Sequence, residues 1–145
     1  GSTVRNNTSN FNSSDGIATS NSSTVTGNSA HANGVDGIDD GGASNISGNT
    51  ARSNGEDGID TSDASTVAGN TVFQNNRDGI RCGDGCTVKG NTVRTNSGDG
   101  MNLGFLSGYR ENVISLNSNN QVSGGVDAGA NVINGIVTPT PATTP

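Results

Sequence analysis

The sequence predicts an all-β solenoid of about six coils, because one phrase of 21 residues recurs from residue 3 to residue 101 without an insertion. The most regular parts of this phrase are one apolar column, two asparagine columns and an Asp-Gly-Ile tripeptide. These columns contain Val4, Val25, Ile46, Val67 and Val88; Asn7, Asn28, Asn49, Asn70, Asn91 and Asn112; Asn12, Asn33, Asn54, Asn75, Asn96 and Asn117; and the tripeptides that begin at Asp15, Asp36, Asp57 and Asp78, with Asp99-Gly100-Met101 as the fifth. A fixed period of this length is typical of repeat proteins whose units stack on one another.

The composition fits a stacked repeat better than a conventional globular core. Only 28% of the residues are hydrophobic, Trp is absent and 23 of the 145 residues are Gly, which alone would suggest disorder. The strict period argues for order, because each repeat adds one or two apolar residues to a continuous core. The net charge of −6 argues against a nucleic-acid partner. No apolar run approaches the roughly 20 residues of a membrane span.

Three short strands fit each repeat better than a helix, because Gly and Asn recur in every period and both lower helix propensity. In the second repeat we expect strands at residues 24–26 and 29–32 and a third strand around Ile38. Side-chain alternation along a strand predicts that Val25, Ala30, Ala32 and Ile38 point inward.

Identical columns are expected to stack, because like strands of successive coils would pair in parallel about 4.8 Å apart. An asparagine side chain both donates and accepts, so a stacked column of asparagines satisfies its own amides. The Gly of each Asp-Gly-Ile tripeptide is expected at a turn position with positive φ, which glycine adopts without steric penalty.

Two phrases, Gly69-Asn70-Thr71-Val72 and Asp78-Gly79-Ile80, resemble the repeats of right-handed parallel β-helices in the pectin-lyase-like superfamily. The resemblance covers about residues 2–122 and implies a right-handed parallel β-helix. It says little about activity, because that superfamily contains lyases, hydrolases, epimerases, tailspikes and plain surface proteins.

The chain divides into three expected parts. Residues 1–122 form the coils of the β-helix, although the register is expected to loosen after Met101 into an apolar loop over residues 102–108. Residues 123–137 are expected to fold over the last coil as a C-terminal cap. Residues 138–145 form a short Thr- and Pro-rich tail.

The aspartates of the tripeptides form a column of like charges that needs a compensating interaction. Unit charges roughly 5 Å apart repel by about 0.8 kcal/mol even at the dielectric constant of water. One interpretation is that each carboxylate accepts backbone N–H groups in its own turn. The other is a row of cations, with Ca²⁺ favoured because all the ligands would be oxygen atoms.

A second charged column follows the tripeptide isoleucines and contains Asp39, Asp60 and Arg81 on successive coils. Side-chain alternation turns this column outward. The arrangement resembles pectate-lyase-like enzymes, in which carboxylates on one sheet hold Ca²⁺ and an arginine acts as base. The resemblance makes Asp39 and Asp60 candidate metal ligands and Arg81 a candidate catalytic residue; no other cofactor is expected.

Cys82 and Cys86 bracket a Gly-Asp-Gly segment. A small disulfide loop is the favoured interpretation and suits an extracellular protein, while two free thiols stay open as an alternative. Zinc is not favoured, because two cysteines alone do not complete its ligand set.

The single histidine, His31, has no partner for a catalytic triad and shares a column with Asn10, Arg52, Phe73 and Arg94. We interpret this column as an ordinary exposed face. It lies beside a row of Thr and Ser that would otherwise suggest ice binding, and its uneven side chains argue against that function.

The sequence favours a secreted, non-enzymatic solenoid at the cell surface or outside the cell, acting as a structural module that associates end to end. A parallel β-helix has unpaired strand edges at its ends, and the first repeat starts at Gly1 with no segment for an N-terminal cap. Val4 and Phe11 are the expected assembly residues at one end, and Pro139 and Pro141 at the other. The alternative is Ca²⁺-dependent binding of an acidic polysaccharide, or its cleavage by a lyase mechanism.

Overall fold

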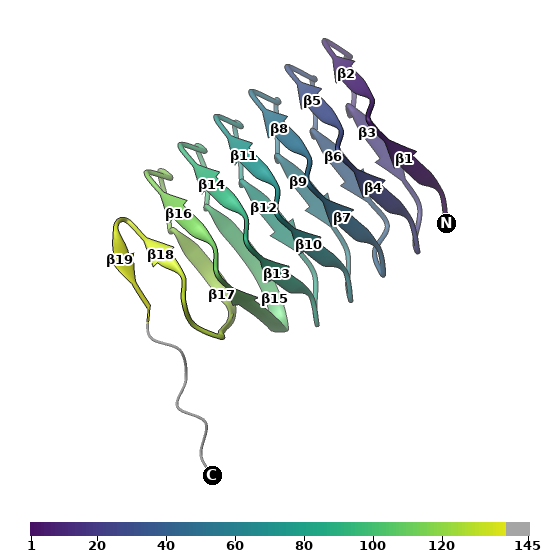
Figure 1. Cartoon of the computed structure of the whole chain (residues 1–145). Coiled ribbons are helices and arrows are strands. Elements are labelled where there is room, and N and C mark those ends of the chain that lie inside the picture. Colours follow the sequence, from purple (N-terminus) through teal and green to yellow (C-terminus); the bar gives the residue numbers. More distant parts are fainter. Residues whose placement is uncertain (139–145) are drawn as a thin grey trace.

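The computed structural model describes residues 1–138, without the side chain of Val137, and within them all regular structure is β-strand. The strands stack as a parallel β-helix of about six coils of 21 residues (Figure 1), so the predicted fold class is confirmed. No helix in residues 1–138 has the length and apolar character needed to cross a membrane.

Each coil contributes one short strand to each of three rows that run along the axis of the solenoid. Row 1 contains β1 (Thr3–Arg5), β4 (Thr24–Thr26), β7 (Asn45–Ser47), β10 (Thr66–Ala68) and β13 (Thr87–Lys89). Row 2 contains β2 (Thr8–Asn10), β5 (Ser29–His31), β8 (Thr50–Arg52), β11 (Thr71–Phe73), β14 (Thr92–Arg94) and β16 (Val113–Ser115). Row 3 contains β3 (Ile17–Thr19), β6 (Ile38–Asp40), β9 (Ile59–Thr61) and β12 (Ile80–Cys82).

The 21-residue register persists beyond the point where the sequence suggested that it loosens. The long strand β15 (Met101–Arg110) continues row 3 with its first three residues and row 1 with its last three. The middle of β15 is also hydrogen-bonded to the preceding coil. The backbone N–H of Phe105 donates to Asp84 Oδ1, and that of Gly85 donates to the carbonyl of Phe105. The loop predicted over residues 102–108 is therefore wrong.

The segment predicted as a cap, residues 123–137, continues the coil before it turns back. Strand β17 (Val122–Asp127) pairs in parallel with β15, and β18 (Val132–Ile133) pairs in parallel with β16. Strand β19 (Ile136–Val137) then returns antiparallel to β18. Pro139 and Pro141, predicted as assembly residues, lie outside the described residues.

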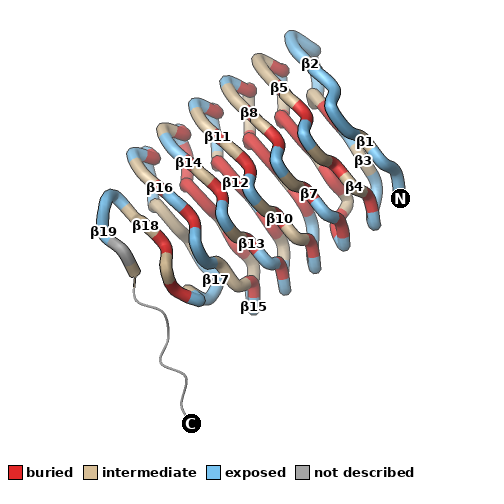
Figure 2. The backbone as a smooth tube through the Cα atoms, viewed as in Figure 1, coloured by how far each residue is buried: buried red, intermediate tan, exposed pale blue. Residues whose placement is uncertain are grey.

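Three columns of apolar side chains, one from each row, fill the interior. They are fully buried at Val25, Ile46, Val67 and Val88 in row 1, at Ala30, Ala51, Val72, Val93 and Ile114 in row 2, and at Ile38, Ile59, Ile80 and Met101 in row 3. Figure 2 shows this burial concentrated in the middle coils. Ala32 does not join the core as predicted, because its φ of 55° carries the chain out of row 2 into a turn and leaves it half-buried.

Buried asparagines connect each coil to the next at the two ends of row 2. Asn70 donates its side-chain amide to the carbonyl of Ile46 and to Asn91 Oδ1, at 3.0 Å each. Its own Oδ1 accepts the backbone and side-chain N–H groups of Asn49. The second column repeats this pattern, with Asn75 bonded to Asn54 and Asn96.

The tripeptide glycines are required for a reason that differs from the predicted positive φ. Gly58 does not have positive φ. A Cβ atom there would instead lie 2.6 Å from Asn75 Nδ2 and 2.7 Å from the carbonyl oxygen of Gly79. The glycine is therefore needed because the next coil approaches its backbone closely, and the positive-φ prediction is wrong.

We expect Asn70→Ala to lower the free energy of unfolding by about 1–3 kcal/mol, because it strands buried donors on Asn49 and removes two bonds to other coils. Asn7→Ala is the matched control, because Asn7 is exposed and lies at the start of the same column. Urea unfolding followed by circular dichroism measures both variants. Equal losses for Asn70 and Asn7 would contradict a stabilising role for the buried amides.

Candidate functional site

Acidic residues concentrate on one side of the solenoid, which we call the row 3 face: row 3 and the two turns that flank it. Every acidic residue up to residue 99 belongs to this region. They are Asp15, Asp36, Asp39, Asp40, Glu56, Asp57, Asp60, Asp63, Asp78, Asp84 and Asp99. Asp40 lies at an inward position of β6 and is buried, where Thr19, Thr61 and the backbone of Gly42 donate to it.

The aspartates of the tripeptides bond from coil to coil. Oδ1 of Asp36 accepts the backbone N–H of Asp57, and Oδ1 of Asp57 accepts that of Asp78, each at 2.7 Å. The same bond links Asp15 to Asp36 and Asp78 to Asp99. We expected each carboxylate to bond within its own turn; the donor belongs to the following coil, because in-register stacking places that N–H next to the carboxylate.

Burial raises the pKa values of two carboxyl groups in the middle of this column. Burial, reinforced by the charges of Asp57, Asp60 and Asp15, raises the pKa of Asp36 to about 7, although the N–H of Asp57 works against the shift. Burial also raises the pKa of Asp57, whose Oδ2 has no hydrogen-bond partner. Arg77 offsets part of this effect, with its Nε 3.9 Å from Asp57 Oδ1.

The structure brings the three sequence-predicted site residues of row 3 together. Asp39 pairs in register with Asp60, and Asp60 pairs with Arg81. Arg81 Nη1 donates to Asp60 Oδ2 at 3.0 Å. Burial is the main cause that raises the pKa values of both aspartates, while Arg81 lowers that of Asp60.

A polar hollow of about 390 Å³ opens over the third to fifth coils of this face. It is lined by Asp60, Thr61, Ser62, Asp63, Arg81, Cys82, Gly83, Asn102, Leu103 and Gly104. Asp60 and Arg81 were predicted site residues, but Asp39 lies outside the hollow. Ser62 was not expected here, and Asp63 and Asn102 were not predicted as site residues, although Asn102 continues the column of Asp60 and Arg81, and Asp63 shares a column with Asp84.

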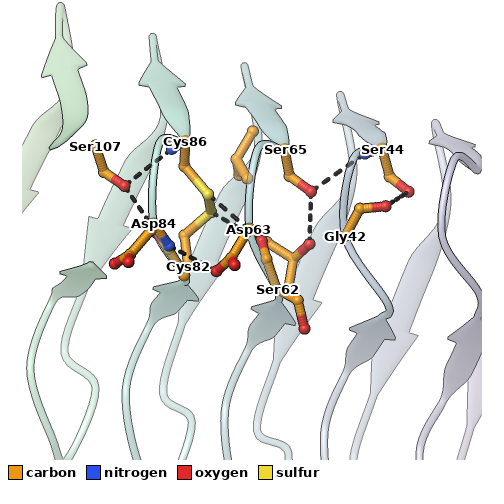
Figure 3. The surroundings of a disulfide bond; sticks show 12 residues. Gly42, Ser44, Ser62, Asp63, Ser65, Cys82, Asp84, Cys86 and Ser107 are labelled. Carbon is orange, nitrogen blue, oxygen red and sulfur yellow. Dashed lines mark hydrogen bonds between the residues drawn. A yellow bond between two sulfur atoms is a disulfide. The ribbon is translucent and has the colours of Figure 1, made fainter. Parts of the chain in front are cut away.

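A disulfide joins Cys82 to Cys86 beside the hollow (Figure 3). On the preceding coil the two equivalent positions are Thr61 and Ser65, whose hydroxyl groups hydrogen-bond at 2.9 Å. The disulfide therefore replaces a hydrogen bond with a covalent link across the turn that follows row 3. Ser107 Oγ accepts the backbone N–H of Cys86 from the next coil.

Asp39 and Asp60 do not by themselves make a calcium centre. Ca²⁺ takes about six to eight oxygen ligands, and in residues 1–138 no three His, Cys, Asp or Glu side chains gather as metal ligands. One oxygen of Asp60 is also engaged by Arg81. Calcium binding stays a prediction.

The candidate assembly residues occupy different environments at the first coil. Val4 is half-buried and pairs in register with Val25. Phe11 is 77% exposed, with a φ of 57°, and meets the ring of His31 edge-on at 5.3 Å. Association through these residues stays a prediction.

Comparison with known proteins identifies the family of this chain. The family model described as "Right handed beta helix region" matches residues 1–136, so the chain belongs to this family. The resemblance to right-handed parallel β-helices is thereby confirmed. A search of curated proteins returned no match.

Solved structures that share the architecture include two epimerases. A double mutant of the periplasmic alginate epimerase AlgG has a TM-score of 0.71 and 18% identity, over 90% of this chain and 38% of that chain. The A-module of the mannuronan C-5 epimerase AlgE6 from Azotobacter vinelandii has a TM-score of 0.55 and 15% identity, over 97% of this chain and 58% of that chain. The present chain spans less than two thirds of either, and such identities show the fold alone.

The raised pKa of Asp36 predicts a specific dependence of stability on pH. The folded state holds this proton more tightly than the unfolded chain, whose value is near 3.8. The resulting stabilisation is complete below that value and is lost as the pH rises through about 7. Asp36→Asn, which mimics the neutral carboxyl group, should therefore raise the melting temperature by about 4 °C at pH 8 and change it little at pH 4.

The control for this experiment is Asp63→Asn, which removes the same formal charge from an exposed turn that also accepts a backbone N–H. Melting curves of the three proteins between pH 4 and pH 8 make the comparison. A destabilised Asp36→Asn variant at pH 8 would show that the charged carboxylate stabilises the fold.

The calcium hypothesis predicts that millimolar Ca²⁺ raises the melting temperature of the protein relative to chelator, since binding to the native state stabilises it by RT ln(1 + [L]/Kd). The double variant Asp39→Asn, Asp60→Asn should lose that increase. Differential scanning fluorimetry measures it, with Mg²⁺ as the control for ionic strength. An unchanged melting temperature in Ca²⁺ would leave these two aspartates with no role in metal binding.

Proposed function

We propose that this chain is a polysaccharide-binding β-helix that holds an extended glycan along its row 3 face without cleaving it. The observation that carries this proposal is the polar hollow over β9, β12 and β15, where Asp60, Arg81 and Asn102 lie on three successive coils. Support comes from the two solved structures of the same fold, whose names assign them to alginate and mannuronan.

The repeat makes the row 3 face suitable for a polymer. Equivalent side chains recur about every 4.8 Å along the axis, so a chain of sugars that lies parallel to the axis meets a polar group at each coil. Carboxylate and amide oxygens accept hydrogen bonds from sugar hydroxyl groups, and Arg81 and Asn102 donate them. The carboxylates of Asp39, Asp60 and Asp63 disfavour an acidic glycan here unless a cation lies between them, so we assign this face to the hydroxyl groups of the glycan.

Cleavage is the less favoured alternative. A lyase mechanism would use Arg81 as base, yet an arginine stays protonated and this guanidinium already donates to Asp60. Release of unsaturated sugars from a panel of acidic polysaccharides would show that the chain is a lyase.

End-to-end assembly is a second candidate function, favoured by exposed apolar side chains on the last coils. Leu116 and Ile136 are each 73% exposed. A partner subunit that covered them would meet a different surface of its neighbour, and such a contact builds an open fibre. Light scattering at several concentrations separates a fibre from a monomer.

We place the protein outside the cytoplasm, in the periplasm, at the cell surface or in the medium. The Cys82–Cys86 disulfide persists in an oxidising compartment. One of the two similar structures is of a periplasmic enzyme, which fits this location.

Glycan binding in the hollow can be tested with a substitution that fills the hollow with a large side chain. Ser62 is exposed and lines the hollow, so Ser62→Trp should abolish retardation of the protein in native gels that contain a neutral glucan. Ser20→Trp is the matched control, because Ser20 occupies the equivalent turn two coils away, is exposed and does not line the hollow. Equal retardation of the two variants would contradict binding in the hollow.

A further inference from the structure

Most of the positive charge lies away from the row 3 face. Of the seven Lys and Arg residues, Arg77 and Arg81 pair with row 3 acids. The other five lie on or at the ends of row 1 and row 2 strands: Arg5, Arg52, Lys89, Arg94 and Arg110. The solenoid therefore has an acidic side and a basic side, in spite of its negative net charge.

One part of the basic side is the outward column of row 2, which contains His31, Arg52, Phe73 and Arg94 on successive coils. We call these four residues the row 2 strip. The ion pairs of residues 1–138 involve Arg77, Arg81 and Arg110. The guanidinium groups of Arg52 and Arg94 thus have no carboxylate partner in the described part of the chain.

Neighbouring rings hold these two guanidinium groups in place. Arg94 Cζ lies over the ring of Phe73, 5.0 Å from its centroid. Arg52 Nη2 lies 3.5 Å from His31 Nδ1, and the ring of Phe11 supports His31 from the other side. Stacking on Phe73 orders the guanidinium of Arg94 while leaving its N–H edge free, which reduces the entropy lost when a ligand binds.

We propose that the row 2 strip binds the acidic groups of an anionic polysaccharide, in addition to the glycan contact on the row 3 face. Arg52 and Arg94 belong to coils two apart, which separates their backbones by about 10 Å along the axis. An extended glycan chain that lies parallel to the axis presents an acidic group to each guanidinium, and a planar guanidinium binds carboxylate or sulfate oxygens in a fork of two hydrogen bonds.

The surroundings of the strip suit a sugar polymer. The adjacent outward column of row 2 carries a hydroxyl group on each coil, at Ser29, Thr50, Thr71 and Thr92. Hydroxyl groups both donate to and accept from sugar hydroxyls. A single-stranded nucleic acid would require a series of aromatic side chains on which bases stack, whereas the row 2 strip carries two rings, those of His31 and Phe73, and Arg94 covers one face of the Phe73 ring.

The test is affinity electrophoresis with a polyuronate, a sulfated glycan, a neutral glucan and single-stranded DNA. The double variant Arg52→Gln, Arg94→Gln should bind the anionic glycans about tenfold or more weakly, as expected for the loss of two charge-assisted contacts. The polyuronate and sulfated arms show which anion is preferred. The control is Arg5→Gln, Lys89→Gln, which removes the same charge from row 1 and should change binding by less than about twofold.

Three results would overturn the proposal: no loss in the Arg52, Arg94 variant, an equal loss in the row 1 control, or binding of single-stranded DNA as tight as that of the glycans. Melting curves establish that each variant is folded. Ser62→Trp should leave this interaction unchanged, so the row 2 strip and the row 3 hollow succeed or fail separately. The comparison is made at about 0.15 M salt, where long-range attraction between charges is screened.

Discussion

Stacking of identical columns at a spacing of 21 residues is the constraint on which the rest of the structure depends. Every coil has to present its N–H groups, carbonyl groups and side chains at the heights set by the coil before it. Asn70 and Asp57 show the consequence, because each bonds to its own counterpart on a neighbouring coil. Gly58 is glycine for the same reason, since the next coil passes too close for a Cβ atom. The fold therefore depends on the repetition of polar contacts from coil to coil as well as on its apolar core.

The same register explains how the chain forms functional surfaces. Outside the core, repetition converts a single outward position into a line of side chains along the axis, and variation within the line sets its chemistry. Asp39, Asp60 and Arg81 share one such line, and burial among like charges raises the pKa values of the two aspartates. His31, Arg52, Phe73 and Arg94 share another on row 2. A linear polymer is the class of ligand whose own repetition matches such lines, which is why both proposed sites take polysaccharide.

Much of the fold and part of the candidate site could be predicted from the sequence, because the 21-residue period alone places residues in columns. The period located the strands, the stacked asparagines and the core positions Val25 and Ile38. It also located the neighbouring row 3 residues Asp39, Asp60 and Arg81. It did not locate the hollow, because Ser62 and Asp63 belong to other columns than Asp60, Arg81 and Asn102 and reach the hollow through the path of the turn. Ala32 and Gly58 were misjudged for a related reason: a local pattern states which way a side chain alternates, but not where the chain bends or how close the next coil lies.

We infer that the stacked rows bind a polysaccharide parallel to the solenoid axis. A crystal structure with a bound oligosaccharide tests it most directly. We expect sugar rings over the row 3 face, with the glycan chain crossing β9, β12 and β15 and contacting Asp60, Arg81 and Asn102 on successive coils. An oligosaccharide bound at an end of the solenoid, or lying across a single coil, would contradict it.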